Sequence, residues 1–424
     1  MKEDFLYYLW QFGKFQTSNL KTVSGQELII FNPGQYQTQS GPDFFNALIE
    51  IDNQKWAGNI EIHIKSSDWY LHHHQEDNNY ENVILHIVWE HDTEVFRKNN
   101  AIVPVLQLKD YVETKLLEHY KLLMKSKKWI PCENVLSEFD KIVVLNWFDR
   151  LYFERLEQKS QAIYHLLKET DNDWETVFFC LLAKNFGLNI NGSIFMEMAQ
   201  SLTYNTVRKE QHGIENLEAL FLGKCGLLQE EMQDDYALKL KSKWQYLKHK
   251  YSIDDYISEP VHFFKLRPDN FPTIRLVQLA QLYCHNHNLF SKCLSLKSPK
   301  EFYELCNVKA SEYWETHYIF DKFSKKKRKT LSKSFIDLLL INTIIPVIFV
   351  YNEYMNRNSD DFILNFMSEL KPEKNIVIDK FSEFGIRAES ALQTQAMIHL
   401  KKNYCDSKKC LQCNFGKLIM GQTT

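Results

Sequence analysis

The chain has 424 residues, too many for one ordinary hydrophobic core, so two or three domains are expected. Hydrophobic residues make up 44% of it and charged residues 25%, a globular composition that excludes wholesale disorder. The formal net charge is -3. A strongly basic field over the whole protein is therefore excluded, and a nucleic-acid site would need a local patch.

The N-terminal sequence opens directly into a helical pattern and lacks the cationic, apolar and cleavage regions of a secretory signal. The most apolar run, residues 338–350, contains Asn342, Thr343 and Pro346 and is shorter than the ~20 residues of a membrane-spanning helix. It predicts a buried helix or strand. Six of the nine cysteines are scattered through apolar or helical surroundings, which is typical of reduced thiols. We expect a cytoplasmic protein without a membrane segment, and no pattern indicates its oligomeric state.

The first 112 residues predict a β-rich domain. Residues 4–12 have the apolar spacing of an amphipathic helix, and five later segments alternate or are β-branched. Residues 66–81, which link two of these segments, predict only a weak helix. The strands are expected at 28–31, 46–51, 56–65, 83–89 and 103–108.

From about residue 110 the pattern becomes helical. Gly187 and Asn191-Gly192 predict breaks between helices. We therefore expect an α+β protein, with domain 1–112 followed by an all-helical domain, 113–400, and a cysteine-containing tail, 401–424. Helices are expected at 141–168, 174–186, 217–228, 236–251, 274–283, 335–341 and 389–402.

Ionisable residues gather on one face of the predicted strand 56–65. Side chains alternate across a strand, so Glu61, His63 and Lys65 share a face opposite three isoleucines. If Asp43 begins the neighbouring strand, its carboxylate can reach Glu61. Two carboxylates on adjacent strands suit Mg²⁺ or Mn²⁺, and a nearby Lys or His can position or activate water. The alternative is a salt-bridged outer face that contributes little energy.

This arrangement, with its literal Pro42-Asp43 pair, resembles the PD-(D/E)XK nuclease superfamily. The resemblance implies a restriction-endonuclease-like mixed β-sheet, with a core of helix, three strands, helix and strand. It also implies that Asp43 and Glu61 hold the metal ion and that Lys65 or His63 assists catalysis. The sequence departs from the superfamily motif in having His63 where lysine is usual, with Lys65 two residues later.

A histidine-rich segment follows this strand and begins with Asp68 and Trp69. His72 and His74, with Asp77, can bind a metal ion directly, because imidazole and carboxylate are common ligands. His86, on the next strand, has the position of a hydrogen-bonded core residue. We expect all six residues to support the Asp43/Glu61 site. They are Asp68, Trp69, His72, His74, Asp77 and His86.

The whole chain also resembles a bacterial family known as a domain of unknown function. The resemblance supplies no activity. It rests on five short motifs and the terminal cysteines: residues 41–44, 61–63, 68–69, 82–86 and 267–272.

The C-terminal cysteines, Cys405, Cys410 and Cys413, have the spacing C-x4-C-x2-C. A C-x2-C pair in a reducing compartment is typical of a metal knuckle, and tetrahedral zinc requires a fourth ligand. His399 or a distant cysteine such as Cys132 can supply it. Some PD-(D/E)XK exonucleases resemble this pattern in holding an iron–sulfur cluster, but their lone cysteine precedes the nuclease motif. Zinc is therefore expected before iron–sulfur, and three unliganded thiols are the alternative.

The sequence thus predicts a divalent-metal-dependent phosphodiesterase, or nuclease, that acts on DNA or RNA. One alternative is a non-catalytic nucleic-acid-binding or scaffold protein with a degenerate nuclease fold, which the His63 substitution favours. A second is a metal-dependent hydrolase that uses His72, His74 and Asp77. No phosphate-binding glycine loop, serine-hydrolase elbow or dinucleotide fingerprint is found.

Overall fold

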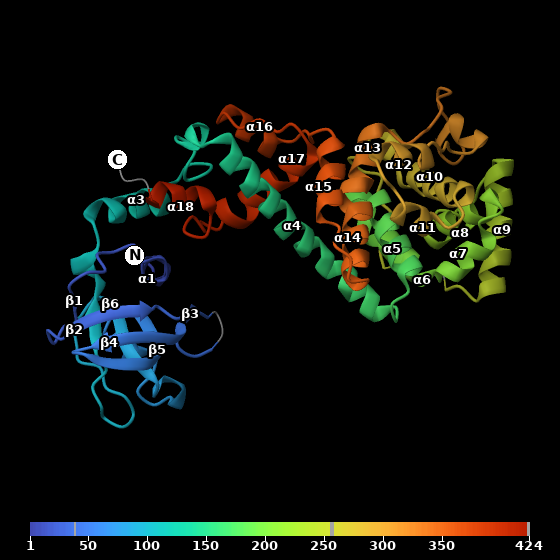
Figure 1. The fold of residues 1–424 in the computed structure, drawn as a ribbon. Helices are drawn as coiled ribbons and strands as arrows, with labels where there is room; N and C mark the ends of the chain where they lie inside the picture. Colours follow the sequence, from blue (N-terminus) through green and yellow to red (C-terminus); the bar gives the residue numbers. More distant parts are fainter. Residues whose placement is uncertain (38–39, 255–257, 422–424) are drawn as a thin grey trace. The chain divides into compact units, whose positions relative to one another are not determined.

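The structure, a computed structural model, describes residues 1–37, 40–254 and 258–421 (Figure 1). The chain forms two compact units. The first, which we call the sheet unit, comprises residues 1–139 and 400–424, and the second, the helical unit, comprises residues 140–399. The helical unit is thus inserted in sequence between two parts of the sheet unit.

The sheet unit contains a mixed β-sheet with strand order β1-β2-β4-β5-β6-β7, and β3 pairs with β4. Strands β1 to β5 pair antiparallel, whereas β5, β6 and β7 run parallel. Helix α1 (Glu3–Phe12) precedes the sheet, and the short helix α2 (Asp68–Leu71) connects β5 to β6. The strands are β1 (Leu20–Lys21), β2 (Glu27–Asn32), β3 (Gln35–Tyr36), β4 (Phe44–Ile51), β5 (Gln54–Lys65), β6 (Val83–Glu90) and β7 (Val105–Gln107).

Strand β5 is buried on both faces over its second half. Ile60 and Ile62 pack in a hydrophobic core with α1, which contacts β5 directly. The opposite face carries Glu61 and His63, only 5% and 2% exposed. Residues 66–81 cover this face, and Trp69 from α2 forms a second apolar cluster there. The expected alternation is therefore confirmed, but the polar face is covered and not solvated.

The C-terminal segment belongs to the core of the sheet unit. Leu411 and Met420 are buried in the same cluster as the residues of α1 and of α3 (Thr114–Lys125). Helix α18 (Asn414–Gly421) contacts α3. The structure thus differs from the expected division, because residues 113–139 and 400–424 join the sheet unit and do not form part of a helical domain or a separate tail. The turns and π-helix of this unit are η1 (Asn78–Tyr80), η2 (Leu108–Tyr111), η3 (Leu136–Glu138) and η7 (Leu400–Cys405).

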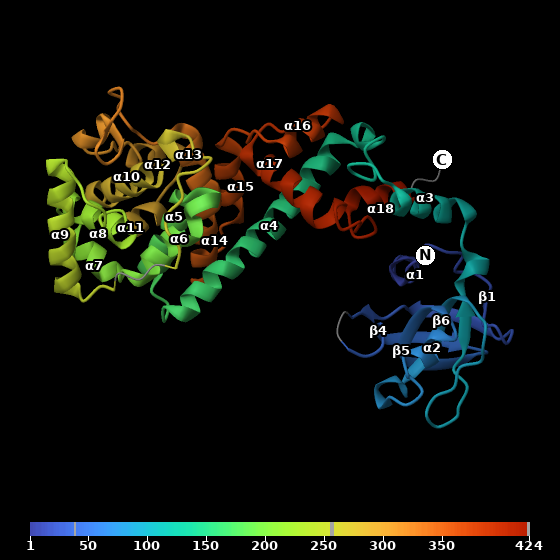
Figure 2. The same cartoon turned by 180° about the vertical axis from the view of Figure 1, so that it is seen from behind.

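The helical unit is built around the long helix α4, which packs against α14 and α17, while α5 packs on α6 and α8 on α9 and α10 (Figures 1 and 2). Two short turns, η4 (Pro268–Asn270) and η5 (Glu312–Glu315), connect its elements. The helices are α4 (Lys141–Glu169), α5 (Trp174–Phe186), α6 (Leu188–Ser201), α7 (Tyr204–Glu210), α8 (Ile214–Lys224), α9 (Asp235–Tyr251), α10 (Pro272–His285), α11 (Leu289–Leu294), α12 (Pro299–Leu305), α13 (Lys333–Leu339), η6 (Leu340–Ile344), α14 (Ile345–Tyr354), α15 (Asp360–Glu369), α16 (Ile376–Glu383) and α17 (Ala391–His399).

Two further expectations differ from the structure. The helical unit is not wholly α, because β8 (His317–Ile319) and β9 (Lys322–Phe323) form a hairpin. Asn191 and Gly192 do not interrupt a helix but lie buried inside α6, and the boundary between α5 and α6 is at Gly187. Asn191 can be buried there because its side-chain amide forms two hydrogen bonds with the backbone of His262. The local sequence cannot indicate a partner so distant along the chain.

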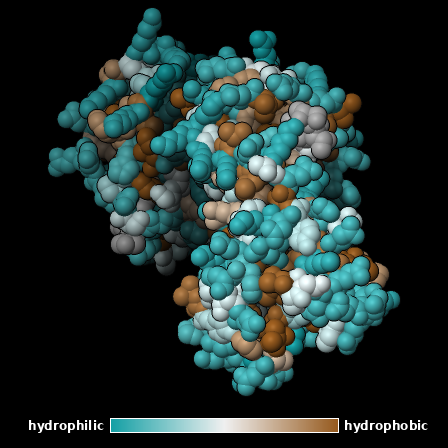
Figure 3. Space-filling view, turned by 90° about the vertical axis from the view of Figure 1, so that its left-hand side faces the viewer, coloured by the Kyte–Doolittle hydropathy of each residue, from teal (hydrophilic) through white to brown (hydrophobic). Residues whose placement is uncertain are grey.

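The apolar run that the sequence singled out forms one continuous helical stretch, 333–354, made of α13, η6 and α14. Its length and composition would allow it to cross a membrane, but 72% of its most apolar window is buried. The polar residue Asn342 is accommodated within this apolar stretch because its side chain accepts a hydrogen bond from the Lys159 ammonium at 2.9 Å. These features are typical of a core helix in a soluble protein, and the surface seen in Figure 3 is mostly hydrophilic.

Gly58, on β5, provides a test of the packing between β5 and β6. A Cβ atom at this position would lie 2.5 Å from Cγ2 of Ile84 and 2.6 Å from the carbonyl oxygen of Asn82. We expect Gly58→Ala to lower the free energy of unfolding by about 1–3 kcal/mol, because neither neighbour can retreat without moving β6. Thermal melting checks this, with the exposed neighbour Ala57→Ser as a control. Equal melting temperatures in the two variants would contradict it.

Candidate metal centre

The start of β4 and the middle of β5 bring Asp43 and Glu61 together. The Asp43 N–H donates to Glu61 Oε2 at 3.2 Å, and the Ile62 N–H donates to Asp43 Oδ2 at 2.9 Å. A bulge in β4, where Asn46 has a φ of 56°, shifts the register just beyond this contact. Each carboxylate is thus fixed by the backbone beside the other, as the sequence predicted for two adjacent strands.

Burial disfavours the charged forms of both carboxylates. Desolvation, followed by repulsion from Glu61, raises the pKa of Asp43, while hydrogen bonds from the Ile62 backbone and the Tyr7 hydroxyl partly oppose the rise. Desolvation likewise raises the pKa of Glu61, to about 8. Within the described residues, neither carboxylate forms an ion pair with a lysine or arginine. A cation bound between them would relieve this repulsion.

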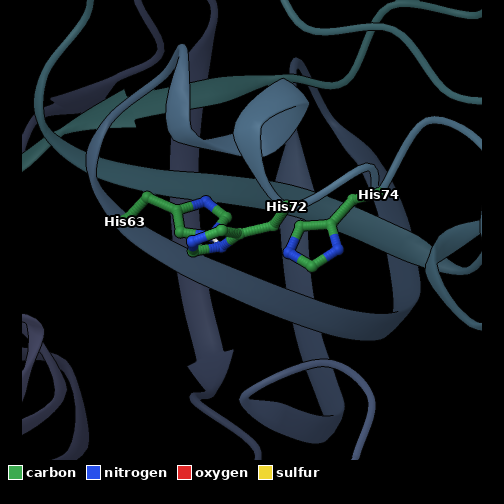
Figure 4. A group of neighbouring side chains, drawn as sticks. All are labelled: His63, His72 and His74. Atoms are coloured by element: carbon green, nitrogen blue, oxygen red, sulfur yellow. Dashed lines mark hydrogen bonds between the residues drawn. The ribbon is translucent and has the colours of Figure 1, made fainter.

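Three histidines surround Glu61 on the covered face of the sheet. His63 Nε2 and His74 Nε2 lie 3.5 and 3.3 Å from Glu61 Oε1. One nitrogen each from His63, His72 and His74 lies within 4.8 Å of the others, a spacing suited to a shared metal ion (Figure 4). His63 comes from β5, whereas His72 and His74 follow α2.

The imidazoles form a continuous hydrogen-bonded chain. His63 Nδ1 lies 2.9 Å from His86 Nε2, and His63 Nε2 lies 3.0 Å from His72 Nδ1. His86 is fully buried, whereas His72 is exposed, so the chain runs from the interior to the surface. Desolvation lowers the pKa of His63 to about 2, that of His86 to about 3 and that of His74 to about 4. These rings are neutral at pH 7 and keep a lone pair for a ligand or a proton.

Two aromatic residues hold the histidines in place. The Tyr80 ring stacks on His74 with centroids 3.7 Å apart, and the Trp69 ring contacts both His74 and His86 edge-on or tilted. The Trp69 indole N–H donates to the Phe96 carbonyl. Trp69 therefore packs against His74 and His86 and makes no polar contact with them.

The remaining predicted site residues lie apart from the carboxylates. The Lys65 ammonium is half exposed and lies 3.9 Å from Asp92, and the Lys65 N–H donates to Asp68. Asp77 caps η1 by accepting from the Asn79 N–H. The structure thus brings together Asp43, Glu61, His63, His72, His74 and His86, but places Lys65, Asp68 and Asp77 in local roles near the covering segment.

Helix α1 contributes two residues that the sequence interpretation missed. Tyr7 hydrogen-bonds to Asp43, and burial together with the nearby carboxylates raises the Tyr7 pKa. Glu3, one helical turn before Tyr7, also raises the pKa of Asp43 and Glu61. Their i,i+4 spacing puts both on one helix face, but only knowledge of which helix covers β4 and β5 would have identified them.

The shifted pKa of Glu61 makes the stability of the metal-free protein depend on pH. Below the ordinary value of 4.5 the carboxyl is protonated in both folded and unfolded states, and no penalty arises. As the pH rises toward about 8, only the unfolded state ionises freely, so the folded state loses stability. We therefore compare the melting temperatures of Glu61→Gln and the native protein, both in EDTA. We expect the melting temperature of Glu61→Gln minus that of the native protein to be about 5 °C larger in alkaline than in acidic buffer.

The control is Glu50→Gln, which changes a partly exposed carboxylate on β4. Calorimetric or spectroscopic melting of all three proteins across this pH range provides the measurement. A difference between Glu61→Gln and the native protein that stays constant with pH would show that Glu61 is not held in its protonated form.

The comparisons with known proteins show a family but no activity. No curated protein and no solved structure matches the chain. A family described as a protein of unknown function, DUF2851, matches residues 3–376, which include the whole metal centre and most of the helical unit. The chain therefore belongs to the DUF2851 family.

Proposed function

We propose that this protein is a divalent-metal-dependent phosphodiesterase that cleaves nucleic acid. The observation that carries the proposal is the carboxylate pair of half-buried Asp43 and buried Glu61, beside neutral imidazoles. Burying two carboxylates beside each other costs several kcal/mol unless a cation compensates them. Such uncompensated, perturbed groups are more frequent at functional sites than elsewhere.

The donor atoms fit a divalent metal ion. Carboxylate oxygens from Asp43 and Glu61 can hold it, and His74 Nε2 is a buried nitrogen without a hydrogen-bond partner in the described structure. The mixture of oxygen and imidazole donors suits Mn²⁺ better than Mg²⁺, which prefers oxygen alone. When bound, the ion would supply Lewis-acid polarisation of the scissile phosphodiester.

The order and direction of the elements support the resemblance to the PD-(D/E)XK superfamily. Helix α1, antiparallel strands β2, β4 and β5, the short helix α2 and the parallel strand β6 follow the order implied by that resemblance. Asp43 immediately precedes the second of these strands and Glu61 lies on the third. The departure is again the lysine, because Lys65 pairs with Asp92 and His63 lies beside the carboxylates.

His63 is suited to position the attacking water by a hydrogen bond, because its lowered pKa makes the ring a weak base. Its ring is neutral at pH 7 and lies within 3.5 Å of Glu61, where the carboxylates would position that water. Its hydrogen bond to His72, which is exposed to solvent, fixes the orientation of the ring. In this scheme His63 performs the task that the superfamily assigns to lysine.

Nucleic acid is the proposed substrate because the same sheet face offers a cation and a stacking ring. Lys55 lies six residues before Glu61 on β5 and therefore on the same face, about 20 Å away. Its ammonium lies 5.0 Å from the centre of the Phe31 ring, which is 51% exposed. An exposed aromatic ring beside a cation is a common contact for a base and its phosphate.

The test is incubation of the protein with single- and double-stranded DNA and RNA in the presence of Mn²⁺, Mg²⁺ or EDTA. We expect Asp43→Asn and Glu61→Gln each to reduce metal-dependent cleavage about 10³-fold, because metal-ion catalysis contributes several kcal/mol. Both variants keep the shape of the side chain, so folding should be retained. Glu50→Gln serves as the matched control with full activity.

Full activity of both variants would refute the assignment. Nucleic-acid binding without cleavage, unchanged by Asp43→Asn, would instead identify a non-catalytic binding protein with a degenerate nuclease fold.

A second candidate function is a zinc-dependent hydrolase that uses His63, His72 and His74, whose nitrogens converge. In that case His72→Ala should abolish the hydrolysis of a nitrophenyl ester, while Asp43→Asn has little effect. Asp77→Asn should leave either activity unchanged, since asparagine retains the oxygen that caps η1. Ester hydrolysis that survives Asp43→Asn and Glu61→Gln but not His72→Ala would replace the phosphodiesterase with this function.

A further inference from the structure

Cys132 and the three C-terminal cysteines meet inside the sheet unit. Cys132 lies in a turn after α3, Cys405 ends η7, and Cys410 and Cys413 precede α18. All four line one small cavity, together with Leu123, Pro131, Tyr404 and Gly416. The other five cysteines of the chain lie in the helical unit.

The thiols lie close enough to influence one another. Desolvation, followed by the proximity of Cys413 and Cys410, raises the pKa of Cys132 to about 12. Burial and then Cys413 raise the pKa of Cys410 to about 11, and burial followed by the other three thiols raises that of Cys405. No disulfide joins the described cysteines. Four mutually close, reduced and partly or fully buried thiols are the donor set of a structural zinc site.

The backbone around the last three cysteines is folded into a compact knuckle. The Lys408 N–H donates to the Cys405 carbonyl at 3.1 Å, and the Cys413 N–H donates to the carbonyls of Lys409 and Cys410. Helix α18 packs so closely on this knuckle that a Cβ atom at Gly416 would lie 1.9 Å from the Cys410 carbonyl oxygen. The knuckle is therefore held in one conformation by backbone contacts.

Nearby cations offset the charge that bound thiolates would carry. Lys401 lies near Cys405, and Lys408 lies near Cys410. The Lys408 ammonium also donates to the Met124 carbonyl at 2.9 Å, which fixes it beside the end of α3. Lysines close to a thiolate cluster favour the deprotonated state that a metal ion requires.

We propose that Cys132, Cys405, Cys410 and Cys413 bind one zinc ion as four thiolates. Cys132 is the fourth ligand, because His399 lies in the helical unit and its Nε2 is 3.4 Å from Glu154. The cavity has a volume of about 10 Å³, which suits a single ion. Binding converts four thiols to thiolates and releases up to four protons to solvent.

This ion joins the two segments of the sheet unit that flank the helical unit in sequence. Cys132 lies shortly before residue 140 and Cys405 shortly after residue 399. The ion therefore closes the chain on both sides of the insertion within the sheet unit itself. Its expected role is structural, since four thiolates leave no open position for a substrate.

The first test is the metal content of protein purified without a histidine tag and passed into metal-free buffer. We expect one zinc per chain, retained by the double variant His63→Ala/His72→Ala and lost from Cys132→Ser and Cys410→Ser. Cys284→Ser, which alters a partly buried thiol of the helical unit, is the matched control and should retain it. Zinc retained by Cys132→Ser, or iron with visible absorbance, would overturn the proposal.

The second test uses the native protein and therefore does not depend on whether a variant folds. X-ray absorption at the zinc edge should show four sulfur neighbours at about 2.3 Å. Replacement of zinc by Co²⁺ should give the near-ultraviolet sulfur-to-cobalt charge-transfer absorption of a cobalt thiolate, which imidazole and carboxylate ligands do not produce. A first shell that contains nitrogen or oxygen would exclude four thiolates and assign the ion to another site.

Discussion

Burial of both faces of β5 is the constraint on which the sheet unit depends. Ile60 and Ile62 pack against α1 on one face, and the segment 66–81 covers Glu61 and His63 on the other. An ordinary antiparallel sheet would expose its second face and leave Glu61 in water. Here the parallel pairing with β6 requires a crossover, and that crossover removes the carboxylate from solvent. The burial that raises the pKa of Glu61 thus follows from the direction of β6.

The two proposed metal centres separate hard from soft donors. Asp43, Glu61 and the histidines offer oxygen and nitrogen, whereas the four cysteines offer sulfur alone. Zinc is held most firmly by thiolates in a closed site, and Mn²⁺ by carboxylates with an open position. The difference allows one unit to keep a structural ion permanently while a second, catalytic ion exchanges with solvent.

The sheet unit is completed only after the helical unit has been synthesised. Leu411 and Met420 enter the same core as α1, so the last residues of the described chain stabilise the first helix. Contacts so distant in sequence carry a high entropy cost of loop closure before they are formed. The free energy of binding a metal ion between Cys132 and the C-terminal knuckle would offset that cost.

The sequence by itself determined the central strands of the sheet unit and the closeness of the two carboxylates. Strands were predicted at 46–51, 56–65 and 83–89 and are found as β4, β5 and β6, because strong period-2 alternation fixes which side chains share a face. The same alternation aligned Glu61 with His63, and the Pro42-Asp43 turn placed Asp43 beside them. The helices 141–168 and 174–186 were equally clear, since each is long and has distinct end signals.

Only the tertiary structure decided which distant residues complete each site. Local patterns cannot indicate that α1 brings Glu3 and Tyr7 to Asp43, that Lys65 pairs with Asp92, or that Asp77 caps a turn. They left Cys132 and His399 as equal candidates beside the terminal cysteines, and packing brought only Cys132 to the cavity. The reason is the same in each case. Periodicity records the face on which a side chain lies, whereas its partners depend on which elements are packed against that face.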